Sequence, residues 1–189
     1  MVRLRSVGYW RATAGIPPTD PRESALIATL DPGSYTGILS GVGGTTGVGL
    51  VKVYDLDQSA GSRLANISTR GFVDVGDNVM IGGIIIGPSD TAAATVLFRA
   101  IGPSLGAAGV QNPLQDPVLE LHDVQGTTIA TNDDWKDTQE TEIEATGIPP
   151  TDNRESAILQ TLNPGNYTAI VKGKNDTTGV ALVEAYHLN

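Results

Sequence analysis

Short apolar runs separated by turn residues dominate the hydrophobic pattern of this chain. Runs rich in Val, Ile, Leu and Thr end repeatedly at Gly, Pro, Asn or Asp. No stretch keeps the 3.6-residue period of a long amphipathic helix, so the pattern is typical of strands joined by tight turns. It predicts strands at residues 64–73, 78–86, 95–101, 118–122 and 127–131, the last two as a hairpin around Gln125-Gly126.

The end of the chain repeats an earlier segment. Residues 15–57 align without a gap on residues 147–189, and 26 of the 43 positions are identical. In each copy an Asp-x-Arg-Glu string predicts one helical turn leading into a strand. A Pro-Gly turn then leads to a predicted hairpin. Its strands are expected at 35–39 and 47–54 in the first copy and at 167–171 and 179–186 in the second.

The offset between the copies predicts a modular architecture. Residues 1–57 correspond to the C-terminal part of a preceding, shortened unit, and residues 58–117 form a unique β-rich middle section. Residues 118–189 then form a sandwich half, so that 58–189 make one full repeat unit. We therefore expect an all-β protein with two related antiparallel β-sandwich units and jelly-roll or Greek-key-like connections.

Composition narrows the classes of partner. The chain has 21 acidic and 12 basic residues, a net charge of −9, which disfavours binding to nucleic acid or to anionic lipid. There are no cysteines, which excludes disulfides and thiolate metal sites without fixing the compartment. The longest apolar stretch, residues 79–87, is too short to insert across a membrane.

Several strings resemble a repeat of large surface and secreted proteins of bacteria, notably Verrucomicrobia. They are SRLANISTRGFV (62–73), GDNVMIGGIIIG (76–87), FRAIGPSL (98–105), DPVLELHD (116–123), ATNDDW (130–135) and ESAILQTLNPGNYTAIVKG (155–173). The second half is also similar to prepeptidase C-terminal (PPC) domains, through its D-x-x-G hairpin, acidic loop and L-x-P-G-x-Y-T string. This resemblance implies an extracellular or cell-surface β-sandwich that is an appendage of enzymes or adhesins, without a settled activity.

Two strings invite a catalytic or phosphate-binding interpretation. Residues 102–106 match the G-x-S-x-G string of serine hydrolases, which requires a strand, a turn, a helix and a His and acid partner. Pro103 and the Gly/Ala residues after it predict a turn instead, and only His122 and His187 are available as a base. The Gly-rich residues 41–47 lack the Lys-Ser/Thr ending of a phosphate loop and predict a hairpin turn. We expect no catalytic residue.

Acidic residues supply the metal candidates. Asp123, Asn132, Asp133, Asp134 and Asp137 offer the hard oxygen ligands that Ca²⁺ prefers, and Glu140 and Glu142 follow them. Asp152 and Glu155 could join them in space. The alternative is a solvated acidic loop, common on an acidic chain. Calcium is the sole cofactor considered. Arg154 and Glu155, matched by Arg22 and Glu23, are expected to form an ion pair within the domain.

The sequence favours a non-enzymatic structural or adhesive module of an extracellular or cell-surface bacterial protein. Its partners would be further copies, joined head to tail into a fibre by strand pairing. The alternative is a carbohydrate- or matrix-binding accessory module of a secreted hydrolase, with calcium-dependent stability. Nucleic acid and membrane insertion are not expected.

Overall fold

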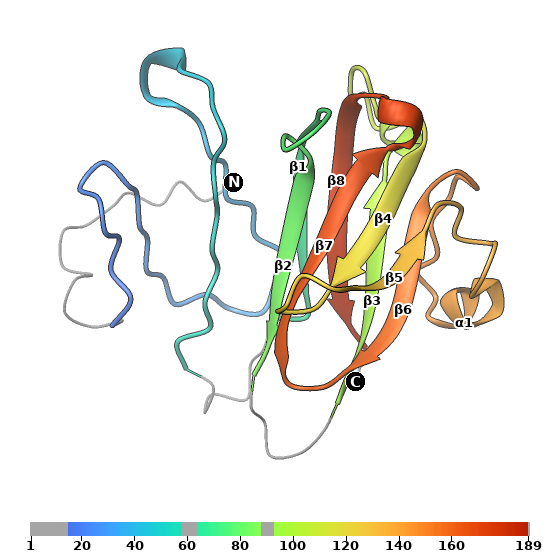
Figure 1. Ribbon diagram of the computed structural model, residues 1–189. Coiled ribbons are helices and arrows are strands. Elements are labelled where there is room, and N and C mark those ends of the chain that lie inside the picture. Colours follow the sequence, from blue (N-terminus) through green and yellow to red (C-terminus); the bar gives the residue numbers. More distant parts are fainter. Residues whose placement is uncertain (1–14, 58–63, 88–92, 189) are drawn as a thin grey trace. The chain divides into compact units, whose positions relative to one another are not determined.

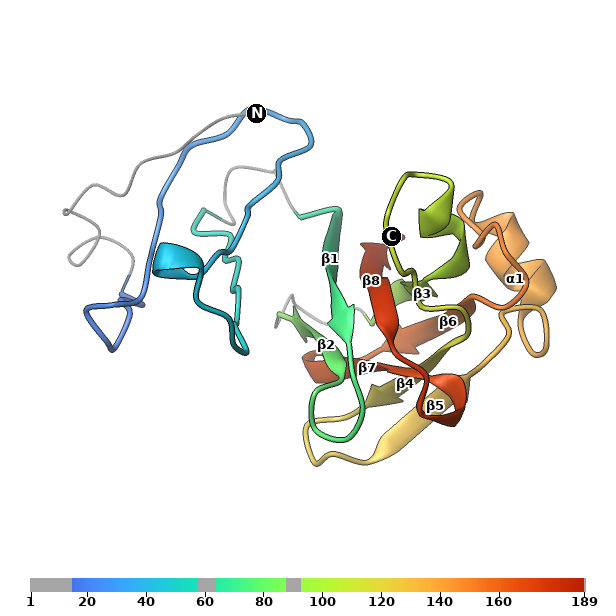
Figure 2. The same cartoon turned by 90° about the horizontal axis from the view of Figure 1, so that it is seen from above.

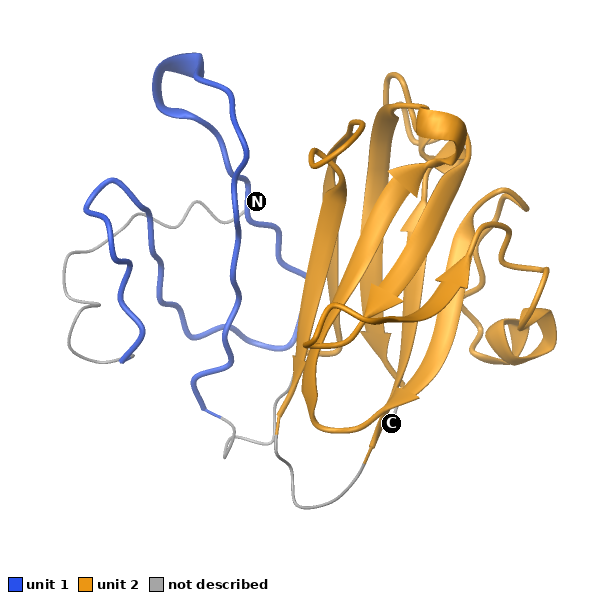
Figure 3. Cartoon of the chain, viewed as in Figure 1, with its two compact units in different colours: residues 1–63 blue, residues 64–189 orange. Residues whose placement is uncertain are grey.

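The computed structural model describes residues 15–57, 64–87 and 93–188. The chain divides into two compact units, residues 1–63 and residues 64–189 (Figure 3). Residues 1–14, which belong to the predicted shortened unit, lie outside the described residues. In the part of the chain that the structure describes, no helix is both long and apolar enough to cross a bilayer.

In the second unit, the described residues 64–87 and 93–188 form a β-sandwich of eight strands. The strands are β1 (Asn66–Val73), β2 (Met80–Ile86), β3 (Ala94–Ile101), β4 (Pro117–His122), β5 (Thr128–Asn132), β6 (Ser156–Leu162), β7 (Gly165–Gly173) and β8 (Gly179–His187). One sheet has the order β1-β8-β3-β6 and the other β2-β7-β4-β5, and all pairs are antiparallel. The two sheets lie face to face (Figures 1 and 2). The predicted all-β class is confirmed.

The connections between the sheets depart from the sequence prediction. Strands β4 and β5 form the predicted hairpin around Gln125-Gly126. The hairpin predicted from residues 167–171 and 179–186 is wrong, because β7 pairs with β2 and β4 whereas β8 pairs with β1 and β3. A single turn of 3-10 helix, Lys174–Asp176, carries the chain from one sheet to the other. Both strands are apolar, and each covers the core from its own sheet.

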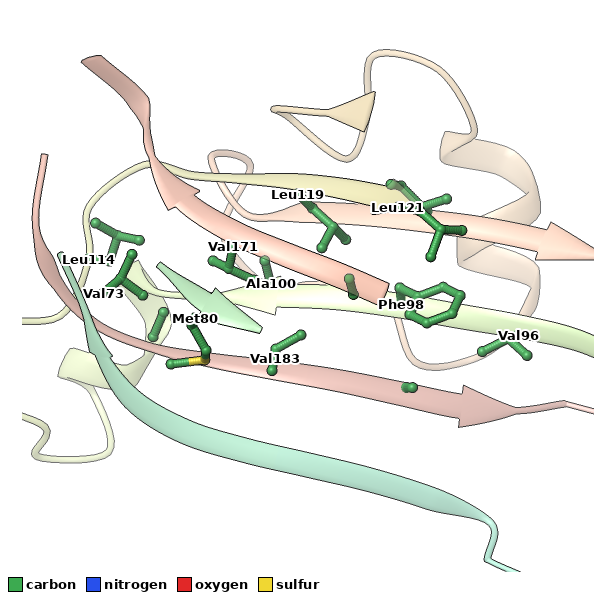
Figure 4. Packing of buried hydrophobic residues seen from close by; sticks show 14 of the residues in the cluster. Val73, Met80, Val96, Phe98, Ala100, Leu114, Leu119, Leu121, Val171 and Val183 are labelled. Carbon is green, nitrogen blue, oxygen red and sulfur yellow. The ribbon is translucent and has the colours of Figure 1, made fainter. Parts of the chain in front are cut away.

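The core lies between the sheets and follows the two-residue period of the strands. Val96, Phe98 and Ala100 of β3 point into it and are at most 1% exposed. Leu119 and Leu121 of β4 point toward them from the opposite sheet (Figure 4). Burying side chains of this size stabilises a domain by about 1.5–3 kcal/mol each. This core holds the loops at both ends of the sandwich in place.

A second cluster covers the other face of β3 and β6. It contains Leu97, Trp135, Ile143 and Ala157. Ile143 belongs to α1 (Glu140–Ala145), a short helix that the sequence analysis did not predict and placed in an acidic loop. The turn at residues 152–155, predicted to be helical, is instead a hydrogen-bonded turn that leads directly into β6.

Residues 15–57 contain no strand. The segments 35–39 and 47–54, predicted to be strands, are extended without sheet pairing, and the regular element there is one 3-10 turn at Val42–Gly44. A strand needs a neighbour for its backbone hydrogen bonds. In the second copy these neighbours are β1 to β4, which come from residues 66–122. Residues 15–57 repeat β6 to β8, and among the described residues they have no such neighbours, so the segments 35–39 and 47–54 stay unpaired.

Candidate functional site

The predicted calcium ligands begin with Asn132, at the end of β5. Its side chain is 5% exposed and makes two hydrogen bonds within the fold. Oδ1 accepts from the amide of Ala157 at 2.8 Å, and Nδ2 donates to the carbonyl of Asp134 at 3.0 Å. Asn132 therefore fastens the acidic loop to β6.

Asp133 lies beside a cation that the chain itself supplies. Lys174 Nζ is 2.5 Å from Asp133 Oδ2 and 3.6 Å from Asp116 Oδ2. The hydrogen bond that Lys174 donates to Asp133 raises the pKa of Lys174. Burial, followed by the charge of Asp133, raises the pKa of Asp134. Asp116 and Lys174 were missed in the sequence, because only the fold brings residues 116, 133 and 174 together.

One oxygen on each of two carboxylates lacks a partner. Asp116 Oδ1 and Asp133 Oδ1 are buried and receive no hydrogen bond from the described residues. Their side chains as a whole are 29% and 35% exposed, so this pair borders solvent. The arrangement suits a small cation or a water, and Lys174 already neutralises part of the charge.

The structure places the remaining predicted ligands at other points of the acidic loop and of the β4–β5 hairpin. Asp123 Oδ1 accepts from the amides of Gln125 and Thr127, both at 2.9 Å, and so closes the β4–β5 hairpin. Asp137 continues the turn after Asp134, whose carbonyl accepts its amide at 3.0 Å. Glu140 pairs with Lys136 at 2.9 Å, and Glu142 lies with it on α1. Within the described ranges, no three His, Cys, Asp or Glu side chains are placed to hold one metal ion.

Ser104, the serine of the G-x-S-x-G string, donates to a buried carboxylate. Its hydroxyl lies 2.5 Å from Glu155 Oε1, and the amides of Gly102 and Ser104 donate to the same oxygen at 3.2 and 3.0 Å. Glu155 Oε2 accepts the amides of Thr151 and Asp152, both at 3.2 Å. Glu155 is fully buried. It ties the turn after β3 to the turn before β6, a structural use of the G-x-S-x-G string.

The ion pair predicted between Arg154 and Glu155 is wrong. Arg154 instead pairs with Asp152 at 2.9 Å, two residues away. The hydrogen bond from Arg154 lowers the pKa of Asp152. Glu155 points into the protein, where its five amide and hydroxyl donors replace the guanidinium, so adjacent charges in the sequence face opposite directions.

His122, which the sequence analysis considered as a base for Ser104, lies on the outer face of the sheet β2-β7-β4-β5. Its Nε2 is 3.1 Å from Glu120 Oε2, and Lys172 Nζ is 2.5 Å from the other oxygen. Partial burial acts to raise the pKa of Glu120, but the hydrogen bonds from Lys172 and His122 outweigh it and lower that pKa. His122 and Ser104 thus have different hydrogen-bond partners.

A shallow hollow of about 480 Å³ opens on this outer face beside the β4–β5 turn. Its lining combines amide, hydroxyl, imidazole and carboxylate groups with small apolar surfaces: His122, Asp123, Val124, Gly126, Asn166, Thr168 and Ile170. Such a mixture can bind a polar ligand such as a sugar hydroxyl, although the hollow is open. The sequence analysis did not find it, because its residues come from β4, β7 and the turn between β4 and β5.

The opposite sheet carries a charged cluster centred on Arg99. Its guanidinium pairs with Glu184 and donates to the carbonyl of Ile148 at 2.8 Å and to Tyr186 Oη at 3.0 Å. Burial and the hydrogen bond to Glu184 raise the pKa of Tyr186. Ser68 Oγ donates to the other oxygen of Glu184 at 3.0 Å. The cluster joins β1, β3 and β8 to the loop before β6.

Comparison with known proteins shows a likeness of fold. No protein-family model and no curated protein matches the sequence. The structure is similar to the pre-peptidase C-terminal domain of a collagenase from Bacillus anthracis, with 11% identity and a TM-score of 0.40. The match covers 64% of this chain and 88% of that chain. A likeness of this size assigns no ligand or activity.

Proposed function

We propose that this chain is a non-catalytic β-sandwich module of an extracellular or cell-surface bacterial protein, and that it joins other elements through strand pairing and apolar contacts. One observation carries the proposal. Strands β1 and β2 are the edges of their sheets on the same side of the sandwich. Phe72, Ile81 and Ile85 on these strands are 59%, 57% and 70% exposed. Edge strands with exposed apolar side chains favour association.

The chain enters and leaves the sandwich at one corner, because Asn66 of β1 pairs with Tyr186 of β8. A sandwich inserted in a longer chain through these two ends would project as a compact body and add little length between its flanking segments. Head-to-tail assembly into a fibre would therefore have to come from contacts between modules. Adhesion and fibre formation are part of this proposal.

Sedimentation velocity over a wide concentration range tests self-association. We expect oligomers that dissociate when Ile81 and Ile85 are both replaced by Thr, since this change removes apolar surface and keeps β-propensity. Ile129→Thr is the matched control, because Ile129 is 41% exposed on β5 at the opposite edge. A protein that stays monomeric at every concentration, or an equal effect of the control, would contradict the proposal.

A second candidate function is binding of a carbohydrate or matrix ligand as an accessory module of a secreted hydrolase, with calcium dependence. The polar hollow beside His122 and Asn166 favours it. Glycan-array and collagen-binding assays test it, with Asn166→Ala expected to abolish binding. For calcium, a rise in melting temperature on adding Ca²⁺ that disappears in Asp133→Asn is expected. Binding that survives Asn166→Ala would exclude this site.

A further inference from the structure

The two copies of the repeat build the same local structure. Arg22 pairs with Asp20 at 2.8 Å as Arg154 pairs with Asp152 at 2.9 Å. The other shared hydrogen bonds join a Tyr hydroxyl to the fourth residue before it and a Thr hydroxyl to the third: Tyr35 to Asp31, Tyr167 to Asn163, Thr45 to Val42 and Thr177 to Lys174. Residues 15–57 therefore already have the turns of residues 147–189, without their sheets.

The apolar side chains of the two copies differ in burial. Four apolar side chains of the first copy are each between 46% and 59% exposed, whereas their counterparts in the second copy are between 0% and 4% exposed. These residues are Leu26, Leu30, Leu39 and Val51, and their counterparts are Ile158, Leu162, Val171 and Val183. The same pattern of side chains is thus a core in one copy and a surface in the other.

Residues 64–133, the acceptor segment, provide the cover in the second copy. Ile158 pairs in register with Phe98, and Val183 pairs with Thr69. Val171 lies in β7 between β2 and β4. Each of the strands β6, β7 and β8 therefore depends on strands of the acceptor segment for its backbone partners, and the core that they share is made of both.

The carboxylate of Glu23 lacks some of the hydrogen-bond donors that its counterpart Glu155 has. Glu23 Oε2 accepts the amides of Thr19 and Asp20 at 3.1 and 3.4 Å, as Glu155 Oε2 accepts those of Thr151 and Asp152. Glu155 Oε1 accepts three donors from the turn at residues 102–104 of the acceptor segment. Among the described residues, Glu23 Oε1 has no such donor. The first copy presents both halves of an interface, apolar and polar.

Occupancy of the acceptor segment decides which partner fits. Residues 147–189 already complete the acceptor segment of residues 64–133. Exchanging one copy of the repeat for the other on this acceptor segment would bury no additional apolar surface. A partner that gains stability must bring an acceptor segment whose own last three strands are missing.

We propose that residues 15–57 form the last three strands of a second β-sandwich, whose other strands come from a second acceptor segment that is similar to residues 64–133 and has no completing strands of its own. Binding would be by strand addition, with main-chain hydrogen bonds giving affinity and the apolar positions giving register. This inference rests on the proposed role as a joining module and names its partner.

A disulfide trap tests the register, since the chain has no cysteine of its own. Lys52 is the counterpart of Glu184, which pairs with Ser68. Full-length Lys52→Cys protein is mixed with the probe, a separate polypeptide of residues 64–146 carrying Ser68→Cys, diluted from urea. We expect one disulfide-linked product of chain and probe. The control probe carries Thr69→Cys, which points to the other face of the strand and should not link.

Four results would overturn the proposal. The first is no linkage, and the second is equal linkage of the Thr69→Cys control. The third is equal linkage between two full-length chains carrying Lys52→Cys and Ser68→Cys, which would make the partner a second copy. Capture of the probe by a Glu184→Cys chain in place of a Lys52→Cys chain would also overturn it, because the probe would then have displaced residues 147–189.

A non-covalent measurement separates the interface from the trap. The probe alone is expected to lack β-sheet circular dichroism and to gain it when the full-length chain is added. Leu39→Asp in the full-length chain should abolish this gain, since the counterpart Val171 is fully buried. Ser40→Asp, whose counterpart Lys172 is 42% exposed, should leave it intact. The probe should still bind a full-length chain that carries Ile81→Thr and Ile85→Thr. Such binding would show that this interface is independent of the self-association through strands β1 and β2.

Discussion

Leu30 and Leu162 occupy the same position of the repeat, so replacing each by alanine isolates the effect of burial. Leu162 is 3% exposed in β6 and belongs to the main core, whereas Leu30 is 46% exposed. The residue removed is identical, and the neighbouring residue before each is Thr. Any difference between the two variants therefore comes from the acceptor segment that covers only one of them.

The expected difference is large. Removing a buried leucine side chain and leaving a cavity costs about 2–5 kcal/mol, and we expect about 3 kcal/mol for Leu162→Ala. Against a total free energy of unfolding of about 5–15 kcal/mol this is a severe loss. For a domain of this size it lowers the melting temperature by about 10 °C. Leu30→Ala should change the free energy of unfolding by no more than about 0.5 kcal/mol.

Urea denaturation followed by far-ultraviolet circular dichroism measures both changes on the isolated full-length chain, and calorimetry gives the melting temperatures. Equal destabilisation by the two variants would refute the reasoning, because it would mean that Leu30 is packed as tightly as Leu162. A negligible effect of Leu162→Ala would equally refute the assignment of Leu162 to the core.

Two further predictions concern polar groups. Ser104→Ala should reduce the free energy of unfolding by about 1–2 kcal/mol in urea denaturation, since Glu155 loses one of its donors; ester hydrolysis abolished by this change would contradict a structural role. The pKa of Glu120 is lowered in the folded protein, so its pairing with Lys172 stabilises the fold above the ordinary carboxyl pKa and is lost as the pH falls through the lowered value. Urea titrations at a series of acidic pH values should show a smaller loss of stability in Glu120→Gln than in the wild type, and an equal loss would contradict the pairing.

Turn chemistry and strand period are local properties, and both were readable from the sequence. The Gln125-Gly126 turn, where Gly126 has φ of 79°, forms the predicted hairpin because glycine adopts this conformation without strain. The predicted strands of residues 64–131 and 167–186 appear within a few residues of their expected ends. The duplicated turns likewise recur in both copies, because their hydrogen bonds join residues at most four apart.

The candidate sites depended on contacts that no local pattern specifies. Lys174 reaches Asp133 across 41 positions, and Ser104 reaches Glu155 across 51, so neither pair leaves a spacing signal in the sequence. The sequence of the acidic loop predicted carboxylate ligands for a cation, but it did not predict that Lys174 lies beside Asp133. The residues around Ser104 match the G-x-S-x-G motif of serine hydrolases. Only the structure shows that the Ser104 hydroxyl donates to the buried carboxylate of Glu155.

An all-β chain with a duplicated segment follows from the amino-acid sequence, since alternation, turn residues and identity between copies are properties of the sequence alone. Tertiary structure decided which copy becomes a sheet. Residues 147–189 and 15–57 share most of their side chains and their turns, yet only the former meet the strands of residues 64–133 that satisfy their backbone and bury their apolar face. A strand is stable only when paired, so the same sequence is a core element in one place and an exposed segment in the other.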